Sequence, residues 1–83
     1  MRKIEQKIVA AYNSGRHFVG GNTEVHPNGD VYLHGNNIVR GREVNTDTLR
    51  DWPTSTTCSR LRALGFRVSV VKGVPHIDGE AIQ

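Results

Sequence analysis

The sequence predicts an α+β fold in which a single antiparallel β-sheet, made of a meander and a C-terminal hairpin, packs with two short helices. Three observations predict this fold. An amphipathic stretch opens the chain, turn residues then separate several short apolar runs, and a second helical stretch with marked ends precedes an alternating segment. A chain of 83 residues suits one domain, so we expect a single domain over residues 1–83.

The first predicted helix covers residues 2–14. Its apolar side chains recur at the i, i+4, i+7 and i+8 spacing of one helix face. These residues are Ile4, Ile8, Ala11 and Tyr12. Gly15 follows as a natural helix stop. We expect residues 16–22 to form a loop, because Gly20-Gly21 loosens the chain there.

Residues 23–46 are predicted to form a meander of antiparallel strands. The expected strands are Thr23–His26, Val31–His34, Ile38–Arg40 and Glu43–Asn45. The strongest turn signal is Pro27-Asn28-Gly29-Asp30, since Pro suits the entry to a turn and Asn-Gly tolerates positive φ. Folding around this turn is expected to make His26 and His34 cross-strand neighbours.

The second predicted helix covers residues 54–64 and is marked at both ends. Thr54 is a favourable N-cap, and Gly65 lies where a left-handed C-cap is expected. The apolar side chains Cys58, Leu61 and Leu64 are predicted to face inward.

A terminal β-hairpin is predicted after this helix. Its strands are expected over Phe66–Val71 and Val74–Ile77, joined by a turn at Lys72-Gly73. Pro75 cannot donate a hydrogen bond to a neighbouring strand, so its strand is predicted to lie at a sheet edge.

The composition excludes several classes of protein. The lone cysteine, Cys58, rules out an intrachain disulfide and a cysteine-based zinc site, and we interpret it as a small buried residue. No apolar run approaches the roughly 18 residues of a membrane span, and no signal peptide is visible. We therefore expect a cytoplasmic protein without a membrane partner.

The distribution of charge favours nucleic acid as the partner. The net charge is +3, and no acidic residue occurs between Trp52 and Ile77. A helix that begins with Ser and Thr and continues with arginines can bind anions such as phosphate. We predict that this segment binds DNA or RNA. The predicted contact residues are Ser55, Thr56, Thr57, Ser59, Arg60, Arg62, Arg67 and Lys72.

The histidines give no metal-binding motif. His17, His26, His34 and His76 are far apart in the sequence, and a zinc site needs further ligands with the right geometry. We expect histidines at the surface or in turns, with no metal site and no cofactor.

Two partial resemblances concern nucleic acids. The helix at 54–64 with its hairpin resembles the recognition helix and wing of winged helix-turn-helix proteins, although the preceding helix would be Thr46–Trp52, cut short by Pro53. The His26–Asp30 segment and the residues after it are similar to the later part of HicA-type toxins, which cleave RNA. The segment that carries the catalytic histidine in those toxins corresponds here to Gly20–Val25, which has none. We expect no enzymatic activity and no catalytic residue.

A resemblance to another family covers most of residues 20–79. The motifs that carry it are Gly21-Asn22-Thr23-Glu24-Val25, Val31-Tyr32-Leu33-His34-Gly35-Asn36-Asn37-Ile38, Trp52-Pro53-Thr54-Ser55-Thr56-Thr57-Cys58-Ser59-Arg60-Leu61 and Ala63-Leu64-Gly65. In this order and spacing they resemble a family of small tailed-phage proteins. Arg62 stands where that family usually has Asn. The resemblance implies a phage origin, and hence action in the host cytoplasm, but no particular activity.

A second hypothesis is that the protein is a phage effector that binds and inhibits a host protein or a host defence complex. Tyr32 and Trp52 are aromatic residues of the kind that anchor protein interfaces. An exposed edge strand can also pair with a partner or with a second copy of the chain, which would give a homodimer.

Overall fold

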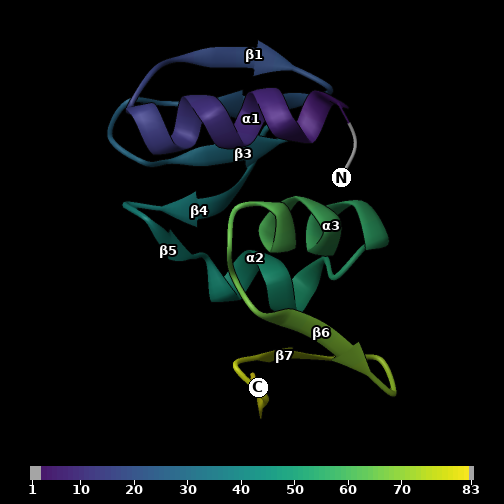
Figure 1. The fold of residues 1–83 in the computed structure, drawn as a ribbon. Helices are drawn as coiled ribbons and strands as arrows, with labels where there is room; N and C mark the ends of the chain where they lie inside the picture. Colours follow the sequence, from purple (N-terminus) through teal and green to yellow (C-terminus); the bar gives the residue numbers. More distant parts are fainter. Residues whose placement is uncertain (1–2, 83) are drawn as a thin grey trace.

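Three helices and two antiparallel sheets make up residues 3–82, the part of the chain that the computed structural model describes (Figure 1). The helices are α1 (Lys3–Ser14), α2 (Thr46–Asp51) and α3 (Ser55–Ala63). The strands are β1 (Phe18–Gly20), β2 (Thr23–Val25), β3 (Val31–Leu33), β4 (Asn36–Arg40), β5 (Glu43–Val44), β6 (Val68–Val71), β7 (Val74–Ile77) and β8 (Glu80–Ala81). The α+β class is therefore confirmed.

The predicted meander forms a five-stranded sheet in the order β1-β2-β3-β4-β5. The predicted loop at residues 16–22 is wrong in one respect, because it contains β1, which pairs antiparallel with β2. Gly21 and Asn22 both adopt positive φ, of 60° and 57°. Two consecutive residues of positive φ match the twist of a tight hairpin. The glycines thus close a hairpin here instead of loosening a loop.

The C-terminal segment forms a separate sheet in the order β6-β7-β8, so the prediction of a single sheet is wrong. The predicted hairpin is present, but the chain turns once more and adds β8. Pro75 therefore lies in the central strand, not at an edge. Its carbonyl accepts a hydrogen bond from the Ile82 amide (3.0 Å), and Ile82 follows the last residue of β8. Pro75 therefore lies at the end of the hydrogen-bond ladder between β7 and β8, where the lack of a backbone N–H is tolerated.

A third helix, α2, was not part of the predicted fold. The side chain of Asn45 caps it by accepting a hydrogen bond from the Thr48 amide at 3.2 Å. The helix ends at Asp51, close to Pro53, because the residue before a proline is disfavoured in helical conformation. It contacts β4 of one sheet and β7 of the other, and so bridges them.

The predicted limits of α3 agree with the structure. Thr54 is the N-cap, and its hydroxyl accepts from the Thr57 amide at 3.1 Å. Gly65 adopts a φ of 103°. Its amide donates to the Arg62 carbonyl, and the Phe66 amide donates to the Leu61 carbonyl, both at 3.0 Å. This pair of bonds is a Schellman C-cap, which requires the left-handed conformation that glycine adopts without strain.

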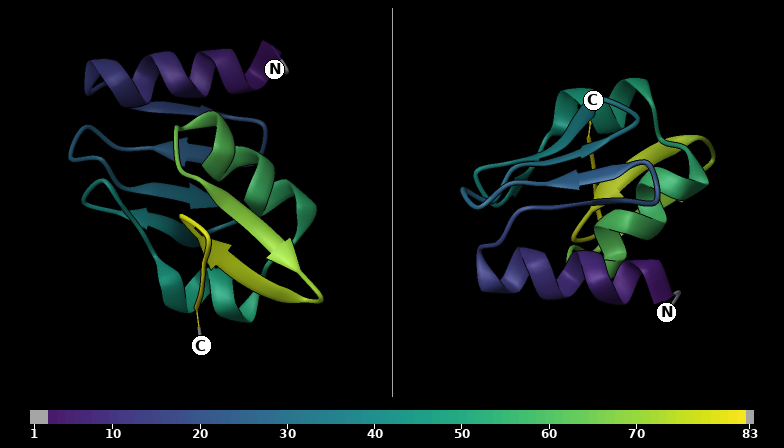
Figure 2. Two further views of the ribbon diagram at one scale, coloured as in Figure 1. Left: turned by 60° about the horizontal axis from the view of Figure 1, so that its bottom comes forward. Right: turned by 90° about the horizontal axis from the view of Figure 1, so that it is seen from above.

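The core lies between the five-stranded sheet and the helices α1 and α3. Figure 2 shows these two helices on the same side of the sheet, and they also contact each other. The fully buried aliphatic side chains come from the five-stranded sheet and from all three helices. They are Ile8, Val25, Val31, Leu33, Ile38, Val39, Leu49 and Leu61. The three-stranded sheet packs below α2 and α3, at the opposite end of the molecule from α1 (Figure 1).

Candidate functional site

Helix α3 carries most of the residues predicted to bind nucleic acid, and the fold divides them between two faces. Thr57 and Arg60 lie on the inner face and are 0% and 5% exposed. The Thr57 hydroxyl is 2.8 Å from the Thr54 hydroxyl. Both side chains therefore make contacts in the protein interior, and neither lies on a surface that a nucleic acid can reach.

Arg60 is the centre of a buried polar network. Its Nη1 atom donates to Glu5 Oε2 at 2.9 Å, and its Nε atom donates to the Thr23 hydroxyl at 3.1 Å. A third bond joins Nη2 to the Gly21 carbonyl at 3.3 Å. Ser59 extends the network, since its hydroxyl donates to Glu5 Oε2 at 2.7 Å. These contacts fasten α3 to α1 and to the turn between β1 and β2.

The outer face of α3 presents a polar stripe to solvent. Ser55, Ser59 and Arg62 follow the i, i+4, i+7 spacing, and Thr56 lies beside them. Ser55 and Arg62 are exposed, whereas Thr56 and Ser59 are half-buried. The Nε atom of Arg62 donates to the Val68 carbonyl at 2.7 Å, so this arginine links the last turn of α3 to β6.

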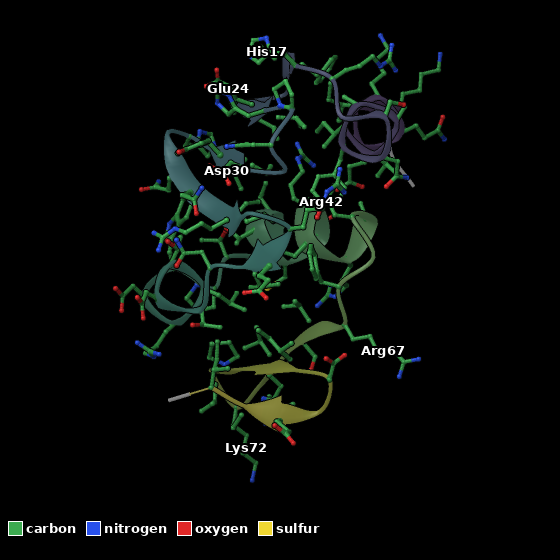
Figure 3. The ribbon with its side chains drawn as sticks, turned by 90° about the vertical axis from the view of Figure 1, so that its left-hand side faces the viewer. His17, Glu24, Asp30, Arg42, Arg67 and Lys72 are labelled. Carbon is green, nitrogen blue, oxygen red and sulfur yellow. The ribbon has the colours of Figure 1, made fainter. Side chains whose placement is uncertain are left out.

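The other two predicted cations lie outside α3. Arg67 precedes β6 and Lys72 lies in the turn between β6 and β7; both are exposed and project from the hairpin (Figure 3). The fold also brings an acidic residue to this region, because the Asp78 amide donates to the Arg67 carbonyl at 2.9 Å. In the folded protein, the segment between Trp52 and Ile77, which contains no acidic residue, therefore lies beside the acidic residue Asp78.

Cys58 lies on the inner face of α3 and is buried, as predicted. Burial raises the pKa of its thiol above the usual value of 9.0, and the nearby positive charge of Arg62 opposes this shift only in part. A thiol of raised pKa is a poor nucleophile at neutral pH. Cys58 is therefore suited to packing.

The histidines are not arranged as predicted. In the β2–β3 register, Thr23 pairs with Leu33, and the His34 amide donates to the Asn22 carbonyl at 2.8 Å. His34 therefore lies at the opposite end of these strands from His26, and their expected proximity is wrong. The near neighbours of His26 are instead His17 and Glu24, a cluster that the sequence analysis missed. The cluster depends on the pairing of β1, which was predicted as a loop.

Aromatic residues occupy the solvent side of the meander and its border with α2. Tyr32 lies edge-on to His26, with ring centroids 5.4 Å apart. Trp52 is half-buried, packs against the core, and lies edge-on to His34, with ring centroids 6.0 Å apart.

No helix within residues 3–82 is both long and apolar enough to cross a membrane.

Comparison with protein families shows that the chain is a small phage protein, as the motifs between residues 20 and 79 implied. It belongs to the Kyanoviridae Gp96 protein family, whose model matches residues 1–81. No curated protein and no solved structure matches the chain.

Proposed function

We propose that this phage protein binds nucleic acid in the host cytoplasm through exposed residues of α3 and of the hairpin that follows it, and that its role is binding and not catalysis. The surface, here called the α3–hairpin surface, consists of Ser55, Thr56, Ser59, Arg62, Arg67 and Lys72. The observation that supports it is the outer face of α3, where Ser55, Thr56, Ser59 and Arg62 form a polar stripe. The Glu5 carboxylate that Ser59 contacts is buried and paired with Arg60.

The chemistry of this surface suits phosphate. The hydroxyl groups of Ser55 and Thr56 can donate hydrogen bonds to phosphate oxygens, and Arg62 adds charge and planar donors. The Ser59 hydroxyl already donates to Glu5 and lines the surface without supplying a donor. The Thr57 amide is already bonded to Thr54, so contacts at the start of α3 would come from Ser55 and Thr56. Such contacts hold a nucleic acid backbone and carry little sequence information.

The burial of Arg60 reduces the number of cations that can contact phosphate and so sets the expected salt dependence. Pairing with Glu5 inside the fold leaves three predicted cations at the surface, namely Arg62, Arg67 and Lys72. Three phosphate contacts on duplex DNA correspond to a slope of about −3 in a plot of log K against log salt concentration.

Fluorescence anisotropy tests the proposal with labelled duplex DNA and single-stranded RNA, each across a salt series. Arg67→Ala combined with Lys72→Ala removes two exposed cations and should reduce the salt slope by about 2. Arg40→Ala removes an exposed cation from β4, outside the α3–hairpin surface, and serves as the control. Absence of binding at low salt, or equal losses in the control, would refute the proposal.

The second candidate function is inhibition of a host protein, and a specific observation favours it. Val70, Val71 and Val74 surround the hairpin tip with 39%, 51% and 38% of their surface exposed. The outer edge of β6 is also unpaired within the described chain, since β6 ends its sheet. An apolar tip beside an open edge suits strand addition by a partner protein or by a second copy in a homodimer.

A pull-down from nuclease-treated host lysate separates the two functions. A specific protein that is retained at high salt and lost in Val71→Lys supports the host-protein function. Loss of every partner on nuclease treatment supports nucleic acid. Size-exclusion chromatography with light scattering of the purified protein detects the homodimer.

A further inference from the structure

We propose that His17, Glu24 and His26 form a binding site for a divalent transition-metal ion of the Zn²⁺ class. The three side chains each offer one ligand atom, and these atoms all lie within 4.8 Å of one another. Two imidazoles and one carboxylate are a ligand set that zinc commonly takes. The proposed metal site lies at the end of the molecule farthest from Lys72 (Figure 3) and is independent of the α3–hairpin surface.

The pairing of β1 with β2 explains why these residues meet. Phe18 pairs with Val25 in the antiparallel register, so one further step places His17 opposite His26. Glu24 is two residues before His26 and therefore points to the same face of the sheet. That face is the one turned away from the core, because Thr23 and Val25 are buried on the other. The register of β1 and β2 therefore brings the three side chains together, and the face on which they lie is open to solvent.

The spacing of the ligand atoms matches that of a tetrahedral ion. Oε2 of Glu24 lies 3.2 Å from Nε2 of His17 and 3.4 Å from Nε2 of His26. Ligands bonded at about 2.0–2.2 Å to a tetrahedral zinc ion are about 3.4 Å apart. Two of the three ligand-to-ligand distances are therefore already suitable. The third is within 4.8 Å, and rotation of His17, whose side chain is 53% exposed, can adjust it.

The surroundings favour a bound ion over a simple ion pair. The His17 and His26 rings lie with centroids 5.4 Å apart, and the edge-on ring of Tyr32 limits the rotation of His26. A divalent ion can accept one ligand atom from each of the three side chains at the same time, which a pairwise contact cannot do. Three protein ligands leave a fourth position for water or an exogenous ligand.

Isothermal titration calorimetry with ZnCl₂ tests the proposal on the full chain without an added histidine tag. We expect one ion per chain. Loss of even an indirect contact to a metal ligand typically costs 10–100-fold in affinity, so Glu24→Gln should weaken binding at least about tenfold. The double variant His17→Gln with His26→Gln should abolish it. Excess Mg²⁺ should not compete, because only one of the ligands is an oxygen.

The matched control is His34→Gln with His76→Gln, which removes two histidines outside the cluster and should leave the affinity unchanged. Circular dichroism melts check that every variant is folded. Zn²⁺ should also raise the melting temperature of the unmodified protein and not that of the His17/His26 double variant. The proposal is overturned if the unmodified protein shows no saturable binding of one ion. It is equally overturned if the control loses as much affinity as the cluster variants.

Discussion

The carboxylate of Glu5 lies 2.9 Å from the Nη1 atom of Arg60, and this ion pair joins the first helix to the third inside the protein. The two side chains are only 5% and 6% exposed. Arg60 also donates to Thr23 and Gly21, so its charge is matched and its donors are distributed over three elements. An arginine that belongs by sequence to a basic surface segment is thus a structural residue.

The first prediction concerns this buried pair. Arg60→Ala removes the buried guanidinium that pairs with the Glu5 carboxylate, and breaking a buried ion pair costs about 3–5 kcal/mol in the free energy of unfolding. Urea denaturation followed by circular dichroism measures the loss. The control is Arg50→Ala, which breaks the exposed pair with Asp47 and should cost less than about 1 kcal/mol. Similar losses in both variants would contradict a structural role for Arg60.

The second prediction concerns the start of α3. Thr54→Ala removes the acceptor of the Thr57 amide and the partner of the buried Thr57 hydroxyl. We expect a loss of about 1–2 kcal/mol in the free energy of unfolding. Thr54→Ser keeps the capping oxygen and should stay close to the unmodified protein. An equal loss in the serine variant would show that the methyl group, and not the cap, matters.

The third prediction concerns Trp52, which packs against the core and lies edge-on to His34. Trp52→Ala should cost about 3 kcal/mol, since it removes a large aromatic side chain from a small core. Trp52→Phe keeps part of this contact and should lose less. If Trp52→Ala leaves the melting temperature unchanged, the side chain does not stabilise the fold and a role in partner binding becomes the better explanation.

The fourth prediction concerns the reactivity of Cys58. Because the thiol is buried and its pKa is raised, iodoacetamide at pH 8 should label the folded protein far more slowly than the urea-unfolded chain. Mass spectrometry follows the labelling. Rapid labelling of the folded protein would show that α3 opens readily.

The same thiol adds a term to the pH dependence of stability. Above the usual pKa of 9.0 the thiol ionises in the unfolded chain but remains protonated in the folded protein. The unfolded state then binds fewer protons, so the free energy of unfolding falls as pH rises above about 9. Below that pH the contribution is complete. Cys58→Ala should remove this part of the decline, as measured by urea denaturation between pH 7 and 10.

Local chemistry is sufficient to predict the two ends of α3 and the turn between β2 and β3. Thr54 and Gly65 bound α3 through contacts within a few residues, and the Asn28-Gly29 turn joins β2 to β3 in the same way. Such signals act over one turn of chain, so the sequence shows them directly. The hairpin of β1 and β2 was missed because its glycines are equally compatible with a loop.

From the sequence alone we predicted the α+β class, the capped helix α3, the terminal hairpin and membership of a phage family. The folded structure was needed to show that Arg60 is buried, because its partner Glu5 is 55 positions away along the chain. The fold also separates the two sheets and places the side chain of His17 close to those of Glu24 and His26. The burial of a side chain, the pairing of strands and the geometry of a ligand set depend on contacts between distant segments. Helix caps and turns depend on residues that are close together in the sequence.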